Sequence, residues 1–157
     1  PDGVLSTDMI VGFPGETDVE FEETMKLIED MRYDVIYAFS YSPRPGTKAF
    51  KLVDDVPEEV KHERLLRLQK RSVEIAAENN AKKIGRELEV LTEGRAKALK
   101  SSPSQNMWFG RTSCGRVVNF SYEGPRDLTG KYIDVKIIRA TGLALTGEFK
   151  PELDDRG

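Results

Sequence analysis

The sequence predicts an α/β segment followed by an all-β module, a five-stranded barrel of the OB-like type. Two observations support this. The N-terminal part alternates an apolar strand, an amphipathic helix and a second apolar strand. After a long helix, the last part holds five short β-rich runs in about 65 residues, separated by Gly and Pro turns. A length of 157 residues accommodates one domain or two small ones.

The first elements form a βαβ unit. A buried strand is predicted at Asp8–Phe13, which ends at a Pro-Gly turn. A helix of about 14 residues is predicted between Asp18 and Arg32, because a Thr-x-x-Glu capping box precedes apolar residues at helical spacing. A second strand, Val35–Tyr41, is rich in aromatic and β-branched residues. Strands joined in this way should be parallel.

Two loops follow these strands, Gly12–Thr17 and Ser42–Thr47. Because ligands bind at the C-terminal ends of parallel strands, these loops should form a wall of one site. Two strands alone are marginally stable, so residues 1–56 are expected to be the last part of a larger α/β domain, with its missing strands before Pro1. A chain that begins on proline and has no signal peptide fits a cut or processed piece.

A long helix is predicted from Asp55 to about Ala81, because an N-capping aspartate and a proline in the first turn precede an apolar stripe. Gly85 marks its end, and the expected domains are residues 1–84, 85–150 and a tail, 151–157. The five strands of the barrel are expected at Glu87–Arg95, Met107–Arg111, Arg116–Ser121, Tyr132–Ala140 and Leu143–Phe149.

A tight turn at Ser113–Gly115 joins the second and third of these strands, and Gly115 supplies the positive φ that such a turn often needs. Arg111 and Arg116 flank the turn, close to several aromatic rings. Exposed rings stack bases and guanidinium groups pair with phosphates, so single-stranded nucleic acid is one expected ligand. The alternative is that the apolar residues are core and the arginines are merely solvated. Trp108 fits either interpretation.

Charge is distributed unevenly. Residues 1–81 carry 10 basic and 17 acidic side chains, whereas residues 82–139 carry 12 and 6. A basic module beside an acidic one indicates a polyanionic partner. The single cysteine, Cys114, excludes an intrachain disulfide and a multi-cysteine metal or iron–sulfur site within this chain, and it fits a reduced, cytoplasmic protein.

Several motifs, in order, resemble the radical S-adenosylmethionine methylthiotransferases, and most closely the MiaB type. They are GFPGET at 12–17, YSPRPGT at 41–47, VPEEVK at 56–61, GRT at 110–112 and RVVNF at 116–120. The resemblance runs from about Asp8 to Glu148. It implies that the chain is a C-terminal fragment: a partial radical-SAM (TIM-like) barrel, a connecting helix and a TRAM RNA-binding barrel.

The resemblance also implies the chemistry. The full-length enzyme uses S-adenosylmethionine and two 4Fe–4S clusters to add a 2-methylthio group to isopentenyl-adenosine beside the tRNA anticodon. This chain lacks the cluster cysteines, so we expect it to be inactive alone and assign it no catalytic residue and no metal ligand. Its expected partners are the anticodon stem-loop of tRNA and the N-terminal part of the same enzyme, with no membrane.

Site residues are expected at both ends of the chain. The residues expected at the S-adenosylmethionine end of the radical barrel are Gly12, Phe13, Pro14, Tyr41 and Ser42. The residues expected to contact RNA are Arg44, Arg95, Lys97, Phe109, Arg111 and Arg116. Arg44 is equally compatible with bracing its loop against Asp54 or Asp55. Glu16 is expected to cap the helix that follows it.

Three other functions remain open. The first is the same chemistry on threonylcarbamoyl-adenosine of tRNA, a branch that can share the PRP sequence at 43–45. The second is a stand-alone RNA-binding module. A third, generic OB-type protein adaptor would bind in a salt-insensitive, RNA-independent way.

Overall fold

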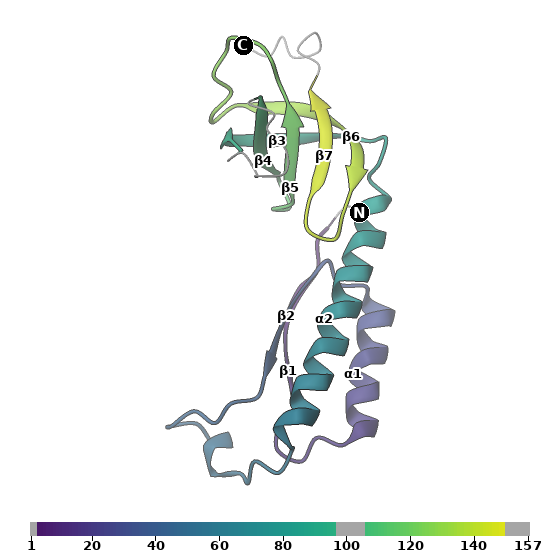
Figure 1. Ribbon diagram of the computed structural model, residues 1–157, viewed down its shortest axis with the longest axis vertical. Helices are drawn as coiled ribbons and strands as arrows, with labels where there is room; N and C mark the ends of the chain where they lie inside the picture. Colours follow the sequence, from purple (N-terminus) through teal and green to yellow (C-terminus); the bar gives the residue numbers. More distant parts are fainter. Residues whose placement is uncertain (1–2, 97–105, 150–157) are drawn as a thin grey trace. The chain divides into compact units, whose positions relative to one another are not determined.

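A computed structural model of the chain describes residues 3–96 and 106–149 (Figure 1). The chain divides into two compact units, Pro1–Ala76 and Ala77–Gly157. The division falls within the last turns of the long helix α2 (Glu58–Ala81). The expected domain limits at residues 84/85 and 150/151 remain predictions, and the expected tail lies outside the described residues.

The first unit contains the predicted βαβ arrangement (Figure 1). Its elements are β1 (Ser6–Val11), α1 (Asp18–Met31), β2 (Val35–Ser40), a short 3-10 helix η1 (Ala49–Lys51) and most of α2. The strands pair in parallel, as predicted, with Ser6 opposite Val35 and Val11 opposite Ser40. Both strands therefore end at the same edge of the sheet.

Helix α1 begins and ends as its sequence dictates. The Thr17 hydroxyl accepts a hydrogen bond from the backbone N–H of Glu20, and the Glu20 carboxylate accepts one from the backbone N–H of Thr17. The helix ends at Arg32, which adopts the left-handed conformation with φ 52°.

One face of the sheet packs against the helices. Val11, Phe21 and Leu68 form the buried centre of this layer. The opposite face leaves large apolar side chains more than half exposed, among them Ile10, Tyr37 and Phe39. A sheet face of this composition is usually covered.

The second unit is a closed barrel of five strands, as predicted. They are β3 (Glu87–Arg95), β4 (Met107–Thr112), β5 (Val117–Ser121), β6 (Tyr132–Ala140) and β7 (Leu145–Phe149). The order around the barrel is β3-β4-β5-β7-β6, and β6 pairs with β3 to close it. All neighbours are antiparallel except β5 and β7. Five strands in a closed Greek-key order are the OB-like architecture.

Alternate residues of each strand fill the barrel. The buried apolar residues are Val90, Trp108, Val118, Phe120, Leu128, Ile133, Val135, Ile137 and Leu145. Gly110 also faces inward, where a Cβ would lie 2.3 Å from the carbonyl oxygen of Leu91. The neighbouring strand can therefore approach this closely only because residue 110 is glycine.

No helix in the described ranges is both long enough and apolar enough to cross a membrane.

Candidate nucleic-acid interface

Two places carry the residues expected to function: the loops that follow β1 and β2 in the first unit, and one end of the barrel in the second. Phe13, two residues after β1, and Tyr41, directly after β2, meet edge to face with ring centroids 5.2 Å apart. The two loops expected to share a site are therefore in contact.

Within these loops the expected cofactor residues differ in exposure. Tyr41 is buried, and its hydroxyl donates to the carbonyl oxygen of Ala49 at 3.0 Å. Gly12 is buried, whereas Phe13 and Ser42 are exposed and Pro14 is half-buried. Phe13 and Ser42 are thus the members of this set most available to a ligand.

Glu16 does not cap α1, so that prediction is wrong. Its carboxylate accepts a hydrogen bond from the backbone N–H of Gly12 at 2.6 Å and pairs with the guanidinium of Arg64 at 2.7 Å. Arg64 also pairs with Asp18 at 2.7 Å. The Glu16 carboxylate lies inside the loop because α2 places the buried Arg64 there. Thr17 and Glu20 cap α1 instead.

Lys61 of α2 supports the same loop. Its side chain is almost fully buried and pairs with Asp54 at 2.7 Å and Glu58 at 2.8 Å. Burial acts to lower the pKa of Lys61, but these hydrogen bonds and charges outweigh burial and raise it. Gly12 has φ +70°, and a Cβ there would lie 2.3 Å from Cγ of Lys61. The loop and the lysine stem therefore fit only with glycine at position 12.

Arg44 is exposed. The two carboxylates considered as its braces bind elsewhere: Asp54 pairs with Lys61, and Asp55 accepts from the backbone N–H of Gly15 at 2.7 Å. The RNA-binding role of Arg44 stays a prediction.

A β-bulge positions Arg95 at one end of the barrel. The pairing between β3 and β4 shifts between Thr92 and Gly94, so that Arg95 lies opposite Trp108. Opposite residues share a face of the sheet, and Trp108 faces inward, so the extra residue turns Arg95 to the same side. The Arg95 guanidinium lies 4.9 Å from the centroid of the Trp108 ring. This is a cation–π contact.

Trp108 belongs to the core, which decides between the two interpretations of its role. It is 2% exposed, and Tyr122 packs edge to face on it with centroids 6.4 Å apart. Its indole nitrogen Nε1 is buried and has no hydrogen-bond acceptor among the described residues.

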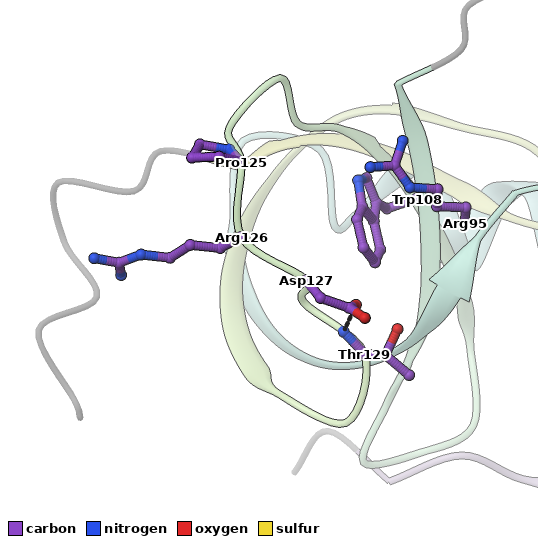
Figure 2. Close-up of a pocket in the computed structure, with 6 residues that line it drawn as sticks. All are labelled: Arg95, Trp108, Pro125, Arg126, Asp127 and Thr129. Atoms are coloured by element: carbon purple, nitrogen blue, oxygen red, sulfur yellow. Dashed lines mark hydrogen bonds between the residues drawn. The ribbon is translucent and has the colours of Figure 1, made fainter.

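A pocket of about 330 Å³ opens beside this pair (Figure 2). It is lined by Arg95, Trp108, Pro125, Arg126, Asp127 and Thr129. The loop between β5 and β6 forms one wall, anchored in the core by the buried side chain of Leu128. Asp127 accepts a hydrogen bond from the backbone N–H of Thr129 at 2.9 Å, which, with a second bond from the Thr129 side chain, lowers the pKa of Asp127. The guanidinium of Arg95 and one ionised carboxylate therefore face the pocket, whereas the side chain of Arg126 extends from the loop away from Trp108 (Figure 2).

The other expected RNA contacts lie outside this pocket. Phe109 is half-buried on the outer side of β4, next to Trp108 in sequence. Arg111 pairs with Glu93 at 2.9 Å and donates to the carbonyl of Gly115 at 3.2 Å. Arg116 donates to the side-chain oxygen of Asn80. Lys97 lies outside the described residues.

The turn at Ser113–Gly115 forms as predicted. Gly115 has φ +78°, and its N–H donates to the carbonyl of Thr112 at 2.8 Å. Sequence reasoning missed Arg126 and Asp127. The one signal in the sequence for this pocket was Gly94, because a glycine inside a strand often marks a bulge. This bulge directs Arg95 toward the pocket that Arg126 and Asp127 also line.

Iron–sulfur ligation does not fit the residues of this chain. Four thiolates are the usual ligands of such a cluster, and Cys114 is the only cysteine. Its sulfur lies 3.2 Å from the hydroxyl of Thr112. Across the described ranges, no three His, Cys, Asp or Glu side chains cluster as metal ligands would.

Comparison with known proteins gives two findings. The family model described as "TRAM domain" matches residues 81–150, which include all five barrel strands. Relatives of the whole chain are named tRNA-2-methylthio-N(6)-dimethylallyladenosine synthase. The Solibacter usitatus protein is 45% identical over 92% of this chain, the Clostridium botulinum protein 47% over 94%, and the Legionella pneumophila protein 48% over 95%. The chain spans about a third of the length of these relatives.

Proposed function

We propose that this chain is the tRNA-holding part of a methylthiotransferase, because more than nine-tenths of its length is similar to the tRNA-2-methylthio-N(6)-dimethylallyladenosine synthases and residues 81–150 match the TRAM domain. The whole enzyme would add a 2-methylthio group to isopentenyl-adenosine next to the anticodon. The relatives are named as dimethylallyladenosine synthases, which favours this base over threonylcarbamoyl-adenosine. A tRNA substrate also favours a cytoplasmic location.

One observation carries the RNA-binding part of the proposal. Arg95 lies over the ring of Trp108, and the side chain of Arg126 extends outward from the β5–β6 loop that lines the same pocket (Figure 2). Guanidinium groups pair with phosphates, and their flat faces stack on bases. A small barrel with such groups at one end suits the backbone and the unpaired loop bases of tRNA. Arg44, Lys97, Phe109, Arg111 and Arg116 remain further proposed contacts.

The first unit would be the end of the radical S-adenosylmethionine domain, up to about residue 84. The large apolar side chains exposed on one face of β1 and β2 support this, because the rest of such a domain would cover that face. Phe13, Pro14 and Ser42 would face S-adenosylmethionine from the strand-edge loops, while Gly12 and Tyr41 hold those loops in shape. The iron–sulfur clusters of the full-length enzyme would be held by cysteines outside this chain, and the chain alone would be inactive.

The test is tRNA binding by this chain across a salt series. Arg95→Ala with Arg126→Ala should weaken binding about tenfold or more and make the slope of log affinity against log salt shallower by about 2, because two cations that lie beside the bound RNA are lost. Arg139→Ala is the control, since Arg139 is exposed on β6 and does not line the pocket.

Arg111→Ala with Arg116→Ala tests two of the remaining proposed contacts. Arg111 and Arg116 bind Glu93 and Asn80, and Arg95 contacts the Trp108 ring, so the urea-unfolding stability of each variant is measured beside its tRNA affinity to separate the two effects. If wild type does not bind tRNA, or binds with no salt dependence, the proposal fails and the generic adaptor gains support.

A further inference from the structure

The pocket beside Trp108 has the size and chemistry of a site for one nucleotide. Its volume of about 330 Å³ lies at the lower end of the range for small-ligand sites, about 300–1,000 Å³. A space of this size suits a single extruded base better than a duplex. The walls come from β3, β4 and the β5–β6 loop, which are all part of the barrel (Figure 2).

The stacking surface is Arg95. Its inner face covers the Trp108 ring at 4.9 Å, and the residue is exposed. A base that enters the pocket would therefore stack on guanidinium rather than on indole, because the indole is 2% exposed. Base stacking on a planar side chain is tolerant of sequence. It explains binding of a nucleotide but not a preference for one base.

A buried polar atom points to an occupant. The Nε1–H of Trp108 has no acceptor among the described residues, although buried indole N–H groups are normally hydrogen-bonded. In Figure 2 the indole edge that carries this nitrogen turns toward the space between Arg95 and Pro125. Because Nε1 is buried, an acceptor oxygen or ring nitrogen of a ligand in the pocket satisfies it only after a shift of the Arg95 side chain that covers the ring.

Asp127 gives the base preference. Its carboxylate keeps acceptor capacity after its bonds to Thr129, since an ionised carboxylate offers about four lone-pair directions. Guanine presents two adjacent donors, N1–H and the 2-amino group, and can meet a carboxylate with both. Adenine and cytosine present an acceptor nitrogen beside their amino group, and uracil presents one N–H between two carbonyls. A carboxylate therefore favours guanine.

We propose that the pocket formed by Arg95, Trp108, Arg126 and Asp127 holds a single unpaired nucleotide of bound RNA, with guanine preferred. The inference rests on the proposed RNA-binding function and goes beyond it, because it names the occupant and the residues that select it. Arg95 stacks on the base and Asp127 accepts from its Watson–Crick edge, while Arg126, whose side chain extends away from the pocket, pairs with a phosphate outside it (Figure 2).

The experiment uses the whole chain with the fluorescein-labelled RNAs UUGUU, UUAUU, UUCUU and UUUUU, and a tRNA transcript. Affinity is read by anisotropy with the labelled pentamers. Pocket occupancy is read with unlabelled RNA from the fluorescence of Trp108, which is the only tryptophan in the chain. UUGUU should bind about tenfold tighter than the other three and should change the Trp108 emission.

The selective variant is Asp127→Asn, which keeps the shape and the acceptor for Thr129 but brings an amide donor into the pocket. It should reduce the guanine preference to about twofold or less. Glu123→Gln is the matched control, because it removes the same charge from the same loop outside the pocket, and it should keep the preference.

The outcomes separate this inference from the proposed function. If tRNA binds in a salt-dependent way but the pentamers bind equally and the Trp108 emission does not change, the nucleotide pocket is refuted and the tRNA-binding function stands. Equal guanine preference in wild type and Asp127→Asn would refute the role of Asp127. If neither tRNA nor any pentamer binds, both proposals fail together.

Discussion

Replacing Arg64 by methionine tests how the first unit is held together. The Arg64 side chain is 6% exposed and its partner Glu16 is 11% exposed, at 2.7 Å. Removing one partner of a buried ion pair costs about 3–5 kcal/mol. The unit has only two layers, so water lies close to the pair, and Glu16 keeps the Gly12 N–H. We therefore expect Arg64→Met to lower the free energy of unfolding by about 2 kcal/mol.

Arg67→Met is the matched control. Arg67 lies on the same helix, and its guanidinium contacts the same Phe21 ring at 5.0 Å, compared with 5.5 Å for Arg64. Its ion pair with Glu22 is about half exposed on both sides. Exposed pairs contribute about 0–1 kcal/mol, so the control should cost less than about 1 kcal/mol.

The assay is urea unfolding with two probes. Circular dichroism at 222 nm follows the helices, and the fluorescence of Trp108 follows the barrel. With a slope of about 1 kcal/mol per molar urea, Arg64→Met should move the helix transition down by about 2 M and leave the Trp108 transition in place. Equal shifts for Arg64→Met and Arg67→Met would refute the argument from burial.

Three further predictions concern single positions. Gly110→Ala should destabilise the barrel by about 1–3 kcal/mol in fluorescence-monitored urea unfolding, because its Cβ would lie 2.3 Å from the carbonyl oxygen of Leu91; wild-type stability would contradict this. Thr17→Ala should lower the free energy of unfolding by about 1 kcal/mol, because it removes the N-cap of α1, and Thr17→Ser should restore that stability. Urea unfolding followed by circular dichroism at 222 nm measures both variants. The pKa of Lys61 is raised above the ordinary 10.5, so the ion pairs of Lys61 stabilise the folded state below that pH, and this contribution is lost as pH rises through the folded pKa. Lys61→Met should not show this loss in urea unfolding between pH 9 and 12.

The strands and helices followed from the sequence because each depends on a local pattern. Glu87–Arg95 and Tyr132–Ala140 have the predicted bounds. The other barrel strands differ by one or two residues at an end, where hydrogen bonding rather than alternation sets the limit. The turn at Gly115 formed because its chemistry is also local.

The candidate site depends on contacts between residues that are far apart in the chain, so less of it could be predicted from the sequence. Glu16 is held by Arg64, 48 residues away, and no local pattern indicates that pairing. Trp108 and Phe109 are neighbours on a strand, so one faces the core and the other faces outward, and only the strand register decides which. Arg95 joins Trp108 because of a bulge, which shifts that register by one residue.

The strand order also determines how the barrel can fold. Its antiparallel pairs β4–β5 and β6–β7 join strands that are neighbours in the chain, so these hairpins can form early. Closure needs two non-local ladders, β3 with β6 and β5 with β7, in which Leu88 meets Val135 and Val118 meets Leu145. Bringing together strands that are far apart in the chain costs entropy before their contacts form, so closure of the barrel should limit the folding rate. During synthesis the barrel cannot close until Leu145–Phe149 has emerged, because β7 is the strand that joins β5 to β6.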